Sequence, residues 1–149
     1  MAASKEITAA CDKMQGQITS GTSSISQRAA LAAYENSLET VISMRDEFRK
    51  RRDLVYSLLK EVPNIKVTLP DGAFYFFPEV KYYFGKRFND QVINNAEELC
   101  LYLLNEAHVS VVTGEAFGNQ DCIRISYAAS VAQLRLAVQR ISDALKALK

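Results

Sequence analysis

Arg124 is the side chain whose type and position most clearly suggest chemistry in this 149-residue sequence. It lies within residues 122–127, where Ile123, Ile125 and Tyr127 alternate with it in the period-two pattern of a β-strand. A guanidinium on a sheet face needs a partner, because an unpaired buried cation is costly. The partner is a structural carboxylate, or water at an edge strand, or a carboxylate ligand that matches two parallel N–H groups of the fork. Spacing alone leaves these alternatives open.

Other chemically capable residues do not form a recognisable site. Gly114 and Gly118 bound a segment with neither a GxGxxG pattern nor a GK[ST] ending, so we interpret them as turn glycines. The single histidine, His108, has no serine or cysteine nearby, which argues against a catalytic triad. The three cysteines are widely spaced and include no CxxC pair, so neither a zinc site nor a disulfide framework is expected.

Charge and hydropathy argue against nucleic-acid and membrane partners. The formal net charge is +1, and the densest basic run, residues 49–52, is flanked by Asp46, Glu47 and Asp53. We expect this run to be the solvated face of a helix, since a nucleic-acid-binding stripe needs uncompensated positive charge. The sequence shows no long apolar run and no signal peptide, and free thiols fit a reducing compartment. A cytoplasmic location is therefore expected.

The first part of the sequence predicts helices around one loop. Residues 5–17 have a helical pattern, and the small hydroxyl residues of 19–26 interrupt it. Ile25 and the helix-favouring residues that follow favour a packed connection over a flexible linker. Over residues 38–62, apolar side chains recur at spacings of three, four or seven, which predicts a long amphipathic helix that ends at Pro63.

A β-hairpin is predicted after this helix. Residues 65–69 alternate between apolar and polar side chains, and residues 73–77 form an apolar run that is core at three of its four aromatic positions. The connection Pro70-Asp71-Gly72 is typical of a turn in which the glycine adopts a positive φ.

Two capped helices and two strands are predicted to complete the chain. Asn95 with Glu98, and Ser130 with Gln133, indicate helix N-termini. Short strands are expected near 109–112 and 122–127. The predicted fold class is α/β, of an α+β-like kind: a helical lead-in followed by a small mixed sheet with helices packed on one face.

Three ordered segments carry a resemblance to a known enzyme family. Residues 71–78 (DGAFYFFP), 109–118 (VSVVTGEAFG) and 123–128 (IRISYA) resemble, in order and spacing, the C-terminal motifs of class I (fold type I) pyridoxal-phosphate-dependent aminotransferases. The serine-rich loop before residues 27–30 (QRAA) is also similar, so the resemblance covers nearly the whole chain. The sequence therefore resembles a C-terminal fragment of an aminotransferase of the aspartate type.

The resemblance implies roles for two residues. The arginine of the family's R-I-S motif, here Arg124, grips the substrate α-carboxylate, and the aromatic residue of its G-A-F motif, here Phe74, lies near the substrate pocket. In the family, the Schiff-base lysine sits in an S-x-x-K context followed by G-x-R-x-G-Y. Ser4-Lys5 is too bare a match, because no G-x-R-x-G follows it. We therefore expect no catalytic and no cofactor-binding residue in this chain.

The resemblance also implies an organisation for the full-length protein. Residues 1–37 would be the connecting helix and loop from a missing large domain, and residues 38–149 the small C-terminal domain. The full-length enzyme would be a homodimer that uses pyridoxal 5'-phosphate to transfer an amino group between an L-amino acid and a 2-oxo acid. The fragment alone is expected to be inactive and to hold no cofactor. The loop at 19–26 would lie near the partner subunit's active site, where Ser20 or Thr22 approaches the cofactor or substrate.

Two alternatives remain open from the sequence. Aromatic or branched-chain specificity is one, because no arginine specific for an acidic side chain can be assigned. A free-standing regulatory module that binds a small ligand is the other, because two strand-strand-helix units also describe such modules. The helical lead-in of the first 62 residues argues against the module, which has no need of it.

Overall fold

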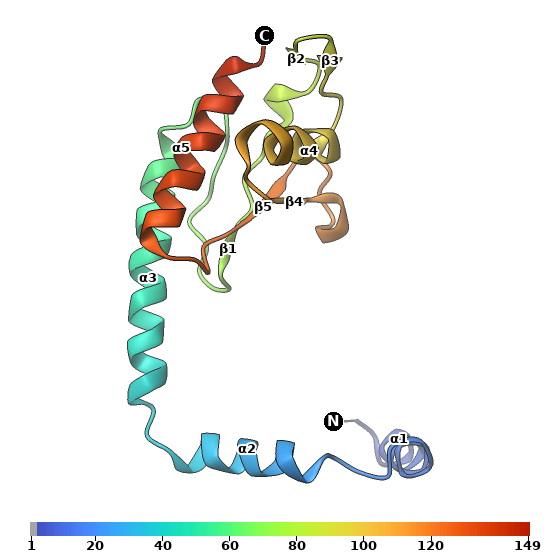
Figure 1. Ribbon diagram of the computed structural model, residues 1–149. Helices are drawn as coiled ribbons and strands as arrows, with labels where there is room; N and C mark the ends of the chain where they lie inside the picture. Colours follow the sequence, from blue (N-terminus) through green and yellow to red (C-terminus); the bar gives the residue numbers. More distant parts are fainter. Residues whose placement is uncertain (1–2) are drawn as a thin grey trace. The chain divides into compact units, whose positions relative to one another are not determined.

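The computed structural model describes residues 3–149, and Figure 1 shows its helices and strands. The described residues form two compact units, one up to Thr40 and one from Val41 to Lys149. Every buried side chain of the described core lies in the second unit. The second unit is therefore the one that can position a site by packing.

The first unit contains two helices, α1 (Lys5–Ile18) and α2 (Ser24–Glu35), and neither has a buried residue. The helix predicted at 5–17 is confirmed. The loop is shorter than predicted, because α2 already begins at Ser24. Gln27 Nε2 donates a hydrogen bond to the Thr22 carbonyl (2.8 Å), which links the first turn of α2 to the loop. Ile25 is 80% exposed, so the packed connection that it suggested is not formed within this unit.

Helix α3 (Glu39–Lys60) confirms the long amphipathic helix. Val55 and Leu59 are buried, whereas Val41 and Met44 are exposed, so only the second half of the helix contributes to the core. The basic run 49–52 is solvated in part: Arg49 and Lys50 are exposed, but Arg51 and Arg52 are half-buried. Arg51 Nη1 donates to the Ala129 carbonyl (3.0 Å), so the expectation of a fully solvated face is wrong at these two positions.

Helices α4 (Ala96–Ala107) and α5 (Val131–Ala147) begin at the predicted capping residues. Asn95 Oδ1 accepts from Glu98 N (2.9 Å), and Ser130 Oγ accepts from Gln133 N (3.3 Å). The carboxylate of Glu98 reaches back to Asn94 N (2.7 Å). The capping box therefore closes one residue earlier than its usual form.

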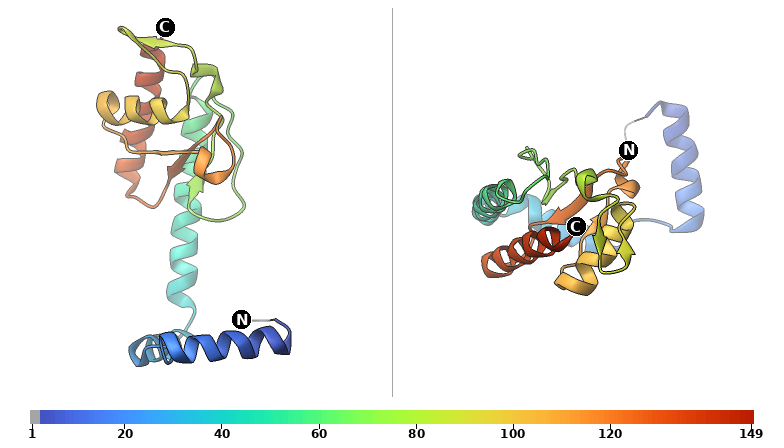
Figure 2. Two further views of the ribbon diagram at one scale, coloured as in Figure 1. Left: turned by 90° about the vertical axis from the view of Figure 1, so that its right-hand side faces the viewer. Right: turned by 90° about the horizontal axis from the view of Figure 1, so that it is seen from above.

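The helices pack together around one core. Figures 1 and 2 show α5 beside the second half of α3, and Tyr102 of α4 donates a hydrogen bond to the Ala144 carbonyl of α5 (2.8 Å). Burial raises the pKa of Tyr102 above its ordinary value. The largest fully buried side chains come from these three helices, the strands β1 and β5, and the segment before α4: Phe76, Leu59, Ile93, Leu99, Leu103, Ile123 and Ile141.

The sheet has three short antiparallel strands, β1 (Tyr75–Phe76), β4 (Val112–Thr113) and β5 (Ile123–Ser126), in the order β1-β5-β4. A separate two-stranded sheet joins β2 (Arg87–Phe88) to β3 (Gln91–Val92). Two 3-10 turns, η1 (Lys81–Tyr83) and η2 (Glu115–Phe117), complete the second unit. The predicted fold class, a small sheet covered by helices after a helical lead-in, is confirmed.

The predicted hairpin of residues 65–69 with 73–77 is wrong. Residues 65–69 form no strand, and only Lys66 makes a single bridge, with Glu79. Strand β1 pairs instead with β5, which sets Phe76 beside Ile125. Gly72 has no positive φ, whereas Ala73 does (62°). Tyr127 holds this turn in place, because its hydroxyl donates to the Ala73 carbonyl and its amide to the Phe74 carbonyl, both at 2.8 Å.

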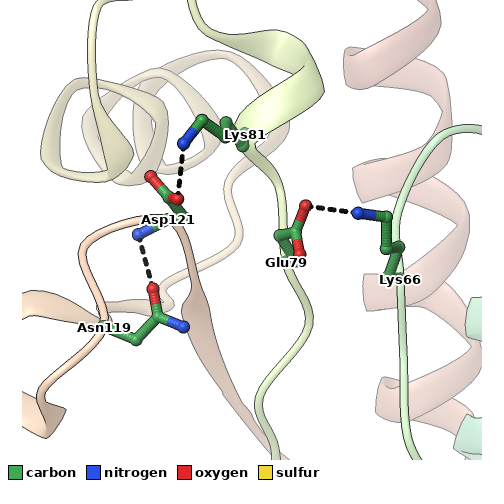
Figure 3. A network of polar contacts seen from close by, with 5 residues as sticks. All are labelled: Lys66, Glu79, Lys81, Asn119 and Asp121. Carbon is green, nitrogen blue, oxygen red and sulfur yellow. Dashed lines mark hydrogen bonds and ion pairs between the residues drawn. The ribbon is translucent and has the colours of Figure 1, made fainter.

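A network of polar contacts, shown in Figure 3, continues the pairing of β1 and β5 beyond the strands. Glu79 forms bridges with Lys66 on one side and Cys122 on the other, and its carboxylate accepts from Lys66 Nζ (2.8 Å). Lys81 Nζ contacts Asp121 (2.8 Å), whose amide donates to the Asn119 side chain (3.0 Å). The hydrogen bond from Lys81 to Asp121 raises the pKa of this exposed lysine. The network fixes the turn that precedes β5.

Candidate substrate-binding site

The two faces of the sheet differ in what they present. Ile123 and Ile125 of β5 point into the core, and Arg124 and Ser126 lie on the opposite face, as the alternation predicted. Cys122 is buried too, although it lies outside the core cluster that contains Ile123 and Ile125, and burial raises the pKa of its thiol. Residues opposite each other in neighbouring strands share a face. Tyr75, opposite Ser126, and Val112, opposite Arg124, therefore join Arg124 on the second face.

Arg124 occupies the middle of this face, and no described carboxylate pairs with it. Its strand is the central one, so Arg124 is not on an edge strand in water. The five ion pairs among residues 3–149 join Arg45 to Asp46, Arg51 to Glu47, Arg52 to Asp53, Lys66 to Glu79 and Lys81 to Asp121. Neither structural explanation of Arg124 raised by the sequence is therefore observed in the described part of the chain.

Two adjacent aromatic rings contact the guanidinium of Arg124. Its Cζ lies 4.7 Å from the ring centroid of Phe117 and 5.5 Å from that of Tyr75. Its Nε is buried and has no hydrogen-bond partner among residues 3–149, and it is the one side-chain nitrogen or oxygen there in that condition. The two terminal nitrogens make no hydrogen bond to a described residue and are not buried in this way, so they retain solvent access. The fork thus faces outward from an aromatic support.

Phe117 is brought to Arg124 by the segment that the sequence assigned to turn glycines. A Cβ on Gly114 would lie 2.3 Å from the Asn119 carbonyl oxygen and 2.4 Å from that of Cys122, so only glycine fits there. Gly118 ends η2 with φ 84°, a conformation that residues with a side chain rarely adopt. The two glycines therefore fold η2 tightly back onto β5 and direct Phe117 to the guanidinium, and the interpretation as turn glycines is confirmed.

Phe74 lies next to this arrangement and is 48% exposed. Its ring meets that of Tyr75 edge-on, with centroids 6.0 Å apart. The described contacts do not place Phe74 against Arg124 itself. Of the aromatic run predicted as core, only Phe76 is fully buried, whereas Tyr75 and Phe77 are half-buried and lie near Phe117.

A second cationic surface lies on α3. A hollow of about 460 Å³ between α3 and the turn at 70–73 is bordered by Arg45, Arg49 and Arg52. Arg45 and Arg52 are paired with the adjacent aspartates, and Arg52 also donates to the Pro70 carbonyl (3.3 Å). These guanidiniums lack the aromatic support and central-strand position of Arg124, and the hollow does not include Arg124. It serves as an internal comparison for the candidate site.

Sequence reasoning missed Tyr75 and Phe117 as parts of the site. Tyr75 was assigned to the core of a hairpin, and Phe117 lay in a turn without periodicity.

His108, expected at a helix end, is the C-cap of α4 with φ 54°. Among residues 3–149, no group of three or more potential metal ligands is found. No helix in that range combines the length and apolar character that a membrane crossing requires.

Known proteins similar to this chain include several aminotransferases. A family model described as aminotransferase class I and II matches residues 1–141. A bifunctional aspartate aminotransferase and glutamate/aspartate-prephenate aminotransferase of Petunia hybrida is 47% identical over all of this chain and 32% of its own length. An aspartate aminotransferase of Pinus pinaster is 45% identical over all of this chain and 31% of its own length.

A solved structure agrees with these relatives. The crystal structure of the aspartate aminotransferase from Rhizobium meliloti is 38% identical, with a TM-score of 0.90 over 97% of this chain and 36% of the other. The chain thus spans about a third of the length of the proteins that it matches.

Proposed function

Because this chain belongs to the aminotransferase class I and II family, we propose that it is part of an aspartate-type aminotransferase, which transfers an amino group between an L-amino acid and a 2-oxo acid. The observation that carries the proposal is the solvent-facing fork of Arg124, which has no carboxylate partner among the described residues. Its role is to bind the substrate α-carboxylate. Amino donors and 2-oxo acids both carry a carboxylate next to the reacting carbon, so one bidentate cation serves both.

Phe74 is proposed as an apolar wall of the same substrate pocket. Its exposed ring borders the face that carries Arg124, through Tyr75. The hydrogen bonds from Tyr127 to the Ala73 and Phe74 carbonyls fix the backbone from which the ring projects. Burial also raises the pKa of Tyr127 above its ordinary value.

The cofactor of this class, pyridoxal 5'-phosphate, acts as an electron sink, and the proposal assigns its site to residues other than those described. A lysine that reacts with this cofactor has to be desolvated so that it becomes nucleophilic. The lysines of residues 3–149 are exposed, apart from half-buried Lys86, which lies over the Tyr82 ring (4.9 Å). In the proposal, the Schiff-base lysine and the cofactor contacts belong to residues outside this chain, and the chain contributes carboxylate binding.

The proposed full-length enzyme keeps the organisation implied by the family. Residues 1–37 form the connection from a large domain, residues 38–149 form the small domain, and the enzyme is a homodimer. The loop at 19–26, which contains Ser20 and Thr22, lies near the partner subunit's active site. The cytoplasm is the proposed location, supported by the free thiols of Cys11, Cys100 and Cys122.

Aspartate or glutamate is the proposed amino donor. The Petunia relative is named for aspartate and for glutamate/aspartate-prephenate transfer, and the pine relative for aspartate. Aromatic or branched-chain specificity is the alternative, since no arginine specific for an acidic side chain can be assigned among the described residues. The family match over residues 1–141 favours the enzyme over a free-standing regulatory module.

An activity assay on the longest gene product that contains this sequence tests the proposal. With aspartate and 2-oxoglutarate, we expect transamination at about 1–1,000 turnovers per second. The 149-residue chain alone is expected to show no turnover and no saturable binding of pyridoxal phosphate, because the required lysine is not part of it. Turnover by the isolated chain would refute the assignment of the cofactor site, and a strong preference for phenylalanine or leucine would favour the alternative specificity.

A further inference from the structure

We propose that Phe117 and Tyr75 are positioning residues whose adjacent rings form a clamp, in the sense that they hold the guanidinium of Arg124 in place and present its two terminal nitrogens to a carboxylate. The role of the carboxylate rests on the proposed function, but the clamp itself is a property of the described residues. The Cζ atom of Arg124 lies 4.7 Å from the ring centroid of Phe117 and 5.5 Å from that of Tyr75. Both distances are within the range of a favourable cation–π contact.

The position of Nε shows which edge of the guanidinium is available. Nε is buried and unpaired among the described residues, so a ligand has no access to the edge that includes it. The two terminal nitrogens keep solvent access. The clamp therefore favours an end-on approach, in which each carboxylate oxygen accepts from one terminal nitrogen. A buried N–H without an acceptor is costly, and the contacts with the two rings partly offset this cost.

The rings are themselves held by an aromatic cluster on the same face. Phe117 lies 6.4 Å from Tyr75 and 6.3 Å from Phe77, with tilted and edge-on ring geometry, respectively. Tyr75 belongs to β1, which pairs with the strand of Arg124. Phe117 belongs to η2, whose approach requires Gly114. Two segments 42 positions apart in the sequence thus meet beside one cation.

The clamp restricts a side chain that is otherwise flexible. A free arginine loses about 2 kcal/mol of rotamer entropy when it is immobilised. A guanidinium already held against two rings has lost much of this freedom before the ligand arrives, so binding is less costly. Removing a ring is therefore expected to weaken carboxylate binding without removing the charge.

Arginine side-chain NMR on the 149-residue chain tests the clamp directly. The Nε–Hε signal of Arg124 is expected to show slow exchange with water and an order parameter typical of rigid groups, about 0.85. In Phe117→Leu the order parameter should fall below about 0.6 and water exchange should become faster. Phe117→Tyr should retain the wild-type signal. Unchanged Nε dynamics in both Phe117→Leu and Tyr75→Leu would overturn the clamp.

Two features keep this test interpretable. Phe117 is 44% exposed on a short turn, so its replacement leaves the core intact, and a thermal unfolding curve checks this. Tyr82→Leu is the matched control, since Tyr82 is an exposed aromatic ring with its own cation, Lys86, and it has no contact with Arg124. The control variant should leave the Arg124 signal unchanged. If its signal changes as in Phe117→Leu, the effect is not specific to the clamp and the proposal fails.

Kinetics of the full-length enzyme test the clamp and the proposed function independently of each other. Phe117→Leu is expected to raise KM for amino donor and oxo acid about 2- to 5-fold, the equivalent of an exposed cation–π contact, and to change kcat less. If Arg124→Leu leaves KM unchanged while the NMR result holds, the proposed function fails and the clamp stands. If Arg124→Leu raises KM but Phe117→Leu changes neither KM nor Nε dynamics, only the clamp fails.

Discussion

Replacing Arg124 by leucine in the full-length enzyme is expected to raise KM for amino donors and for 2-oxo acids alike, by roughly 10- to 150-fold. Both substrates present the same carboxylate, and a charged hydrogen-bonded contact contributes about 1.5–3 kcal/mol. Steady-state kinetics with each substrate varied in turn measures the effect. Arg124→Lys should lie between the wild type and the leucine variant, because lysine keeps the charge but loses the planar fork.

Arg49→Leu is the matched control for this prediction. Arg49 is also a cation of the second unit, but it is exposed on α3 and borders a separate hollow. Its loss should leave both KM values unchanged. Wild-type KM values in Arg124→Leu would show that Arg124 has a structural role and that the carboxylate binds elsewhere.

Replacing Phe76 by alanine is expected to destabilise the second unit by about 3–5 kcal/mol. The ring is fully buried, lies parallel to Tyr56 at 6.3 Å and packs against Tyr127 at 5.5 Å, so its removal leaves a cavity between the sheet and α3. The loss is large against a typical total stability of about 5–15 kcal/mol. Urea unfolding followed by circular dichroism measures it as a lower midpoint with an unchanged slope.

Phe74→Ala provides the comparison for Phe76→Ala. It makes the same chemical change two residues earlier, at a side chain that is 48% exposed. Substitutions of surface residues usually change stability by no more than about 0.5 kcal/mol, so the loss should be well below that of Phe76→Ala. Equal destabilisation by the two variants would contradict the assignment of Phe76 to the core and Phe74 to the surface.

The helices were predictable because their signals are local. The spacing of apolar residues in α3 and α5 and the capping residues Asn95 and Ser130 each act within one or two turns. The burial of individual residues was less predictable. Val41 and Met44 follow the apolar pattern of α3 but are exposed, because the core covers only the second half of the helix.

The pairing of strands was not predictable from local pattern. Residues 65–69 alternate as a strand does, yet β1 pairs with β5, about 50 positions away, and buries Phe76 against Ile125. A hairpin would have been closer in sequence, but it would not have joined Phe76 to the helices that cover β5. Ala73 takes the left-handed conformation expected of Gly72 because Tyr127 binds the Ala73 and Phe74 carbonyls.

The candidate site was predictable in its central residue only. Arg124 is identified by its residue type within an alternating strand, which is a sequence property. Its aromatic neighbours are not, since Tyr75 and Phe117 come from different segments and meet only when η2 folds against the sheet. Gly114 signalled a turn, but the Cβ clash that makes glycine necessary there depends on the Asn119 and Cys122 carbonyls.

The most direct test of the account is a crystal structure of the full-length protein with a bound 2-oxo acid or dicarboxylate substrate analogue. We predict that the carboxylate oxygens accept hydrogen bonds from the two terminal nitrogens of Arg124, at about 2.7–2.9 Å, with Phe117 and Tyr75 still covering the guanidinium. A carboxylate bound by other residues, with Arg124 beyond about 4 Å, would contradict the central claim that Arg124 binds the substrate.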